Sequence, residues 1–180
     1  MTLIQDKNSE PIEDFSQCHA GIVKRLDMLG ELPALLEPAA RAREIAQHAV
    51  EFFREAIFEH HLDEERDLFP AVLAHAVEGD ERDQVQRLAK RLTDQHRELE
   101  ALWKHLESDL KKVAQGRPSE VRIDDLQRLV AQYRAHAGLE EAEFLPLSKA
   151  ILGRNANHMA ALGLALHVRH ASTDLIPTYV

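Results

Sequence analysis

One pattern of residues occurs twice in this chain and constrains the fold more than any other feature. Residues 60–70 read His-x3-Glu-Glu-x4-Pro, and residues 136–146 repeat the same residue types at the same spacing. Another histidine precedes each copy at nearly the same distance, because His19 lies 41 residues before the first copy and His96 lies 40 before the second. The repetition predicts a duplicated structure in which each half supplies two histidines and a glutamate to a common interior.

Apolar residues recur at the spacing of amphipathic helices along most of the chain, and no segment shows a convincing strand pattern. Glycine and proline indicate where helices break: Gly30, Pro33 and Pro38 mark one connection, and turns are expected at residues 78–80 and 116–118. The helices predicted between these breaks cover residues 11–29, 39–69, 81–114, 124–152 and 156–170.

The predicted fold class is all-α, an antiparallel up-down four-helix bundle from two duplicated helical hairpins, plus a C-terminal helix. Pro70 is expected to kink or end the second helix, because proline lacks an amide hydrogen, with a short helical continuation to Val77. We expect a single domain over residues 1–180, with the core bundle at about 11–152 and the C-terminal helix and tail at about 153–180.

Composition excludes several classes of partner and site. The chain has 22 basic and 31 acidic residues and a net charge of −9, which argues against nucleic acid and anionic membranes as partners. The first residues do not read as a signal peptide, and no run of about 18 apolar residues predicts a membrane span. A single cysteine, Cys18, excludes an intramolecular disulfide and a cysteine-rich metal site, so a cytoplasmic location is expected.

In each copy of the pattern, a histidine and a glutamate share one face of a helix. Residues four apart lie about 5–6 Å from each other, so His60 with Glu64, and His136 with Glu140, can reach one centre. The two upstream histidines are expected to point inward from the other two helices. Two buried carboxylates that face each other repel unless a cation lies between them, and a dinuclear metal centre meets that need.

The types of donor narrow the choice of metal. Mixed imidazole and carboxylate ligands suit iron, manganese or zinc. Six protein ligands shared by two ions would leave coordination positions for a small molecule, such as dioxygen, nitric oxide or peroxide.

These residues resemble the hemerythrin-like family, the HHE cation-binding domain. That family has a histidine on its first helix and His-x3-Glu-Glu before an apolar-Pro ending on its second, and then repeats both elements. The resemblance covers about residues 11–150 and implies a non-heme di-iron centre with bridging carboxylates and a bridging oxygen. The ligands that it implies by position are His19, His60, Glu64, His96, His136 and Glu140.

One position departs from the oxygen carriers of that family. The carriers have His-x3-His on the third helix, whereas the residue four after His96 is Glu100 in this chain. The missing imidazole favours peroxide or nitric oxide chemistry, or sensing, at least as much as reversible dioxygen carriage. Glu100 is either a ligand itself or an exposed residue on a charged face.

A second histidine and a second glutamate lie directly beside the expected ligands of the first copy. His61 also has a glutamate four residues later, Glu65, but the repeat favours His60 because the position that matches His61 is Ala137. Glu65 and its counterpart Glu141 are candidates either for orienting ligand histidines or for solvated surface.

Aromatic residues are expected around the centre. Tyr133 lies three residues before His136, where its hydroxyl would either donate a hydrogen bond to a bound oxygen species or pack in the core. Phe53, Trp103 and Phe144 are expected to form hydrophobic walls that exclude water.

The predicted function is that of a non-heme di-iron protein that binds or reacts with dioxygen, nitric oxide or peroxide. If the protein is an enzyme, we expect an oxidoreductase. The alternative is an iron-dependent sensor, or a protein that delivers iron for repair, without turnover of its own. Either role admits a redox or iron-acceptor protein as a partner.

Overall fold

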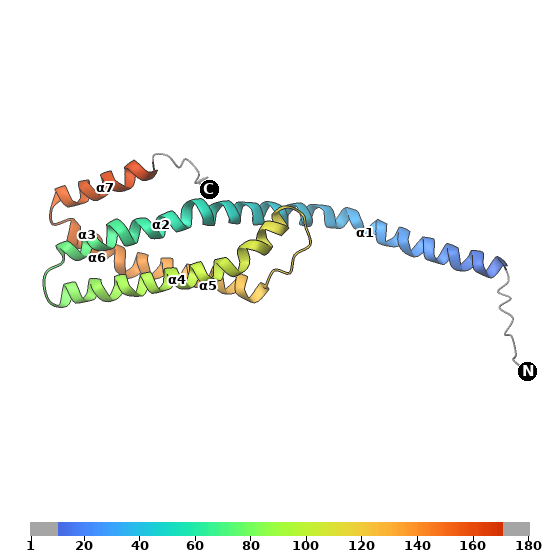
Figure 1. Ribbon diagram of the computed structural model, residues 1–180, viewed down its shortest axis with the longest axis horizontal. Coiled ribbons are helices and arrows are strands. Elements are labelled where there is room, and N and C mark those ends of the chain that lie inside the picture. Colours follow the sequence, from blue (N-terminus) through green and yellow to red (C-terminus); the bar gives the residue numbers. More distant parts are fainter. Residues whose placement is uncertain (1–10, 171–180) are drawn as a thin grey trace, which may run out of the picture.

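The structure is a computed structural model that describes residues 11–170, and every regular element in this range is helical, which confirms the all-α prediction. Residues 11–170 form three long rods and a final helix (Figure 1). The first rod joins α1 (Pro11–Phe52), η1 (Phe53–Ile57), α2 (Phe58–Asp63), η2 (Glu64–Leu68) and α3 (Phe69–His75) end to end. The second rod is α4 (Asp80–Ala114), and the third joins α5 (Ile123–Leu139), η3 (Glu140–Phe144) and α6 (Leu145–Leu152), before α7 (Ala156–His170). Each η element is a single turn of π-helix.

The second rod, α4, holds the other two together. It packs along the end of α1 on one side and along α5 on the other, while α3 contacts α6 (Figure 1). Two apolar clusters fill the interior, one around Phe69 and Phe144 and the other around Trp103 and Leu129. The turn before α4 contains Gly79 with a φ of 100°, a left-handed conformation that suits glycine.

The predicted break at Gly30, Pro33 and Pro38 is wrong, because α1 continues through all three residues as one helix. Proline's fixed φ near −65° is compatible with a helix, and an exposed helix can leave the affected carbonyl groups to water. The first of the predicted bundle helices therefore does not lie against the others. Residues 11–42, which we call the arm, project from the bundle (Figure 1).

The final helix, α7, covers one end of the bundle. It contacts η2 and α6. The rings of His75 and His158 lie 3.6 Å apart between their centroids, and Arg154, just before α7, pairs with Glu81 on α4. None of the described helices combines the length and the apolar character needed to cross a membrane.

Candidate metal centre

Each copy of the repeated pattern folds as one π-helical turn that begins at its first glutamate. In η2 and η3, the amide five residues later, of Phe69 or Leu145, donates to the carbonyl of Glu64 or Glu140. A proline follows that amide directly in both copies. Because proline has no amide hydrogen and crowds the carbonyl four residues earlier, it favours the wider turn. Pro70 thus widens the helix and α3 continues beyond it.

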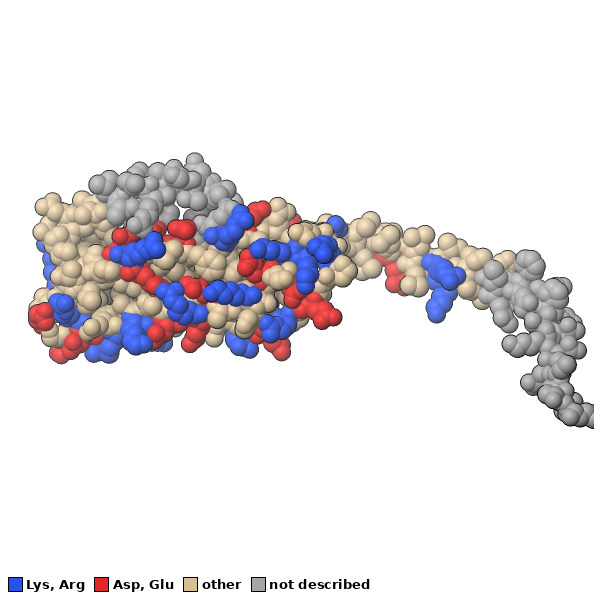
Figure 2. All heavy atoms as spheres, viewed as in Figure 1, with Lys and Arg blue, Asp and Glu red and all other residues tan. Residues whose placement is uncertain are grey.

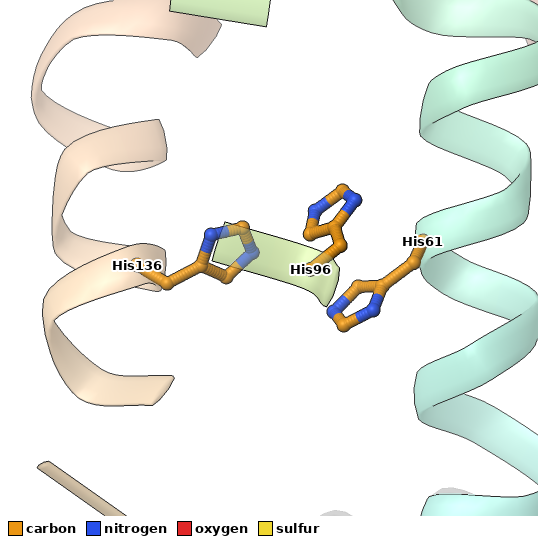
Figure 3. Close-up of side chains that lie close together, drawn as sticks. All are labelled: His61, His96 and His136. Carbon is orange, nitrogen blue, oxygen red and sulfur yellow. The ribbon is translucent and has the colours of Figure 1, made fainter. Parts of the chain in front are cut away.

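Five buried side chains from the three rods converge between the two apolar clusters. The donor atoms of Glu64, His96, His136 and Glu140 all lie within 4.8 Å of one another, as do those of His61, His96 and His136. Each of the five residues is at most 6% exposed. Figure 3 shows the three imidazoles pointing toward one another from the three rods. We call these five residues the inner cluster.

The two glutamates of the inner cluster each face a histidine nitrogen. Oε2 of Glu64 lies 3.3 Å from Nε2 of His96, and Oε1 of Glu140 lies 3.4 Å from Nε2 of His136. The other oxygen of Glu64, Oε1, lies 3.4 Å from Nε2 of His60. The carboxylate of Glu64 therefore lies between a buried histidine and a half-exposed one.

The imidazole rings of the inner cluster pack directly on one another (Figure 3). His61 stacks on His96 with centroids 3.9 Å apart and an angle of 6° between the planes. Both rings meet His136 edge-on, at 5.5 Å for His61 and 4.8 Å for His96. The three rings therefore form one contiguous group of imidazoles at the centre of the site.

Two side chains outside the cluster fix the orientation of two of its three histidines. Nδ1 of His96 donates to Oε1 of Glu65 at 2.8 Å, and Nδ1 of His136 donates to Oε1 of Gln95 at 3.2 Å. A histidine that donates through Nδ1 presents the lone pair of Nε2, and this arrangement is typical of metal-ligating histidines. Glu65 thus takes the orienting role that the sequence left open.

Several donor atoms that face the centre lack a hydrogen-bond partner. Several buried atoms have no hydrogen bond to the described residues: both ring nitrogens of His61, Nε2 of His96 and His136, Oε2 of Glu64 and Oε1 of Glu140. Buried polar atoms normally have such partners, and leaving them unpaired costs about 1–3 kcal/mol each. A cation bound among these lone pairs would satisfy them together, so the residues present fit a metal ion.

The electrostatics of the inner cluster also suit a cation. Burial, reinforced by His96 and His136, lowers the pKa of His61 to about 3, and burial with His96 lowers the pKa of His136 to about 4. Both imidazoles are therefore neutral at pH 7, as ligands must be. Burial and the charge of Glu64 raise the pKa of Glu140 to about 8. Burial opposes ionisation of Glu64 as well, but His96 and His60 outweigh it and lower its pKa.

Aromatic side chains surround the inner cluster. Tyr133 lies beside it, with its ring 6.2 Å from His61 and 5.8 Å from His136 between centroids. Burial, followed by the charges of Glu140 and Glu64, raises the pKa of Tyr133 to about 12, so its hydroxyl keeps its proton. Phe53 stacks on Trp103 at 4.0 Å, and Phe144 packs edge-on against Phe69, a residue not singled out from the sequence, at 4.9 Å.

The structure brings together four of the six residues that the sequence singled out, namely Glu64, His96, His136 and Glu140. His60 lies beside Glu64, but its side chain is 50% exposed. His61 occupies the interior instead. A signal for His61 exists in the sequence, because Phe53, Ile57 and His61 follow one another at four-residue intervals on the buried face.

His19 does not reach the inner cluster in this structure. It is exposed on the arm, and the 41 residues of helix that separate it from His60 extend about 60 Å at 1.5 Å per residue. Glu100 also lies outside the cluster, because its carboxylate accepts a hydrogen bond from Arg97 at 2.6 Å. The structure thus shows Glu100 in a surface ion pair.

Comparison with known proteins agrees with this geometry. The sequence profile of the hemerythrin HHE cation-binding domain matches residues 10–148, most of the chain. The protein belongs to this family. A protein of Haemophilus influenzae (strain ATCC 51907 / DSM 11121 / KW20 / Rd), described as an uncharacterized protein, is 28% identical over 160 residues. The match covers 85% of this hemerythrin-like chain and 90% of that relative. No solved structure matches the chain closely enough to establish a relationship.

Proposed function

We propose that this hemerythrin-like protein holds two iron ions and uses them to bind or transform dioxygen, nitric oxide or peroxide. The observation that carries the proposal is the inner cluster, in which buried imidazole and carboxylate atoms face one another without partners. Family membership supports a cation at this position. The absence of thiolates among the facing groups and the mixed nitrogen and oxygen donors suit iron, with manganese or zinc as competitors.

The inner cluster would hold the first ion. Two imidazoles and two carboxylates would bind it, those of His96, His136, Glu64 and Glu140. His61 would be a fifth donor. Glu65 and Gln95 keep Nε2 of His96 and His136 directed to the centre, so the ligands need little rearrangement when the ion binds.

The second ion would lie on the outer side of Glu64. Oε1 of Glu64 faces His60 there, at the same 3.4 Å that separates Glu140 from His136 in the second copy. The family resemblance assigns His60 and His19 as ligands, and Glu64 has one oxygen for each side. We therefore propose that Glu64 and His60 would hold the second ion, with His19 as the further ligand that the resemblance implies, although His19 lies far from His60 within one chain.

When bound, iron would supply the redox chemistry and the vacant coordination positions for a small molecule. The chain's own residues provide the surroundings. The stacked rings of Phe53 and Trp103 exclude water on one side of the cluster. Tyr133, whose ring lies beside His61 and whose hydroxyl keeps its proton at neutral pH, would supply a hydrogen-bond donor near the centre.

A second function, iron sensing or delivery, is favoured by one specific observation. His60 is half exposed, so an ion held there would be within reach of a chelator or an acceptor protein. In that case the outer ion would leave quickly, while the inner ion would stay in its buried position. Rapid loss of half of the iron to a mild chelator, without peroxide turnover, would favour delivery over catalysis.

The experiment that tests the proposed function compares the wild-type protein with the His136→Ala variant. Both are purified anaerobically, loaded with ferrous iron, and then exposed to hydrogen peroxide, nitric oxide or dioxygen. We expect visible absorption changes and peroxide consumption in the wild type, and neither in the variant. Equal spectra for the two proteins would contradict the proposal, because His136 is central to the inner cluster.

A further inference from the structure

The arm is poorly suited to remaining free in water. Many large apolar side chains along it are exposed: Ile22, Val23, Leu26, Met28, Leu29, Leu32, Leu35 and Leu36. The face of the arm seen in Figure 2 carries few charged residues, whereas charges of both signs cover the bundle on the same view. An exposed apolar surface of this length marks an interaction site. The arm therefore has a binding surface, and its occupant must match an apolar helix.

Among the described residues, the side of the first rod that carries His60 is left open to solvent. The His60 side chain is 50% exposed, and Phe52, about two helical turns earlier, is 49% exposed. A helix laid beside His60 would cover this side and would bring a fourth rod to the bundle.

The arm of a second copy fits this position in register. In this arrangement the first rods of the two chains run antiparallel, and His19 of one chain lies beside His60 of the other. Counting in opposite directions from that pair, apolar residues of the arm meet apolar residues of the bundle. Two of the resulting pairs join exposed arm residues to half-buried residues of the bundle, Leu26 with Phe53 and Leu29 with Val50.

The same register leaves room for both bundles. Its two-fold axis passes between Ala39 and Ala40, whose small side chains let two helices approach closely. Each bundle begins at about Arg43, because the Arg43 side chain lies against Gly116 at the end of α4. In the antiparallel pair, Arg43 would lie beside residue 36 of the other chain. Seven residues of helix, about 10 Å, would then separate the ends of the two bundles.

The straight course of α1 also points to exchange between chains. Pro33 and Pro38 both disfavour the interior of a helix strongly, and Gly30 disfavours it to a smaller extent. The sequence predicts a turn here, which would let the arm fold back on its own bundle. A turn that opens into a continuous helix is how an element is exchanged between identical chains.

We propose that two copies of this chain exchange their arms and form an antiparallel dimer, in which His19 of each chain lies beside His60 and Glu64 of the other. Each metal centre would then be built from both chains. The dimer itself follows from the apolar faces and their register. Only the role of His19 as a ligand rests on the proposed function.

Crosslinking of the metal-free protein tests the dimer independently of iron. In a Cys18→Ser background, Ala39→Cys places two cysteines next to the two-fold axis, where a short bis-maleimide should join the chains. The matched control is Ala101→Cys, an exposed position on α4 that would lie far from its counterpart in the dimer. We expect a dimer by light scattering and a crosslink in the first variant alone. A monomer, or equal crosslinking of both variants, would overturn the proposal.

Complementation tests whether the arm serves the other chain's centre. A His19→Ala chain keeps its inner cluster, and a His136→Ala chain keeps its arm, so a mixed dimer has one complete centre. We expect the co-expressed pair to bind more iron per chain than the average of the two variants alone. Iron equal to that average would contradict exchange. If even the wild type binds no iron, the proposed function fails while the crosslinking result still decides the dimer.

Discussion

The carboxylate of Glu65 accepts a hydrogen bond from Nδ1 of His96 at 2.8 Å, and its other oxygen pairs with Arg97. This contact links the second glutamate of the first pattern to the histidine of the second half. Because it fixes which nitrogen of His96 faces the centre, it prepares the ligand before any ion arrives.

Replacement of Glu65 should therefore weaken metal binding without removing a ligand. We predict that Glu65→Ala lowers the affinity for ferrous iron by about 10–100-fold, because His96 loses the acceptor that orients it. Titration with a competing chelator measures this change. Glu100→Ala is the matched control, since the carboxylate of Glu100 pairs with Arg97 whereas that of Glu65 accepts from His96. Equal losses in both variants would show that the orientation of His96 is unimportant.

Metal binding should release a proton from the inner cluster. The raised pKa of Glu140, about 8, means that this carboxyl is largely protonated at pH 6 in the metal-free protein, whereas a bound ion requires the carboxylate. We predict that the affinity rises between pH 6 and 8 by up to about tenfold per pH unit. Calorimetry in buffers of different ionisation enthalpy counts the protons. Affinity that stays constant over this range would contradict the prediction.

Glu140 should also cost the metal-free protein stability at high pH. Its folded pKa is raised above the unfolded value, so its contribution to stability is fully present below the ordinary pKa of 4.5 and is lost as pH rises through about 8. We predict that Glu140→Gln raises the free energy of unfolding by about 1–3 kcal/mol at pH 8, and by less at pH 5. Urea unfolding at the two pH values measures the effect.

The exposed neighbour provides the control for this prediction. Glu141→Gln removes a charge next to Glu140 in sequence but on the outside of the helix. It should leave the unfolding free energy within about 0.5 kcal/mol of the wild type. The same Glu140→Gln variant should lose iron binding, so a variant that is more stable yet still binds iron normally would contradict the assignment.

The adjacent histidines His60 and His61 allow a matched comparison. His61 lies in the inner cluster and His60 lies on the outer side of Glu64. We predict that His60→Ala removes the outer ion, about half of the bound iron, while the tightly held ion stays. His61→Ala should keep the outer ion and weaken the inner one. Iron content after chelator treatment separates the two, and identical losses would refute distinct positions.

Acidification should destabilise the metal-free bundle through the buried imidazoles. The pKa values of His61 and His136 are lowered to about 3 and about 4, so their contribution to stability is present above the usual value of 6.5. That contribution is lost as pH falls through the folded values. We predict that His136→Gln reduces the loss of stability between pH 6 and 4. Thermal unfolding across this range measures it, and an unchanged slope would contradict the prediction.

Helical spacing predicted most of the fold, because periodicity in α4 and α5 directly reflects which face is buried. The boundaries near Leu152 and Gly153 also agree with the sequence. The continuation of α1 through Pro33 and Pro38 could not be predicted, because proline disfavours a helix without forbidding it. Whether such a segment turns or stays straight depends on what the arm contacts, and the local sequence does not determine that contact.

The candidate site was predictable to a similar extent. Glu64, His96, His136 and Glu140 follow from the repeat, because paired residues four apart on a buried face must meet. The sequence gives conflicting signals for His60 and His61. The repeat favours His60, whereas the apolar residues at four-residue intervals, Phe53 and Ile57, favour His61. The π-helical turns at Glu64 and Glu140 went unrecognised, although the proline after each turn was visible.

We propose above that the inner cluster is a metal centre. The iron content of the anaerobically purified protein, with and without His136, tests this most directly. We predict close to two iron ions per chain in the wild type, with absorption bands of oxo-bridged iron after oxidation, and almost none in His136→Ala. A wild-type protein that remains free of iron after loading, or a His136→Ala variant with undiminished iron, would contradict the claim.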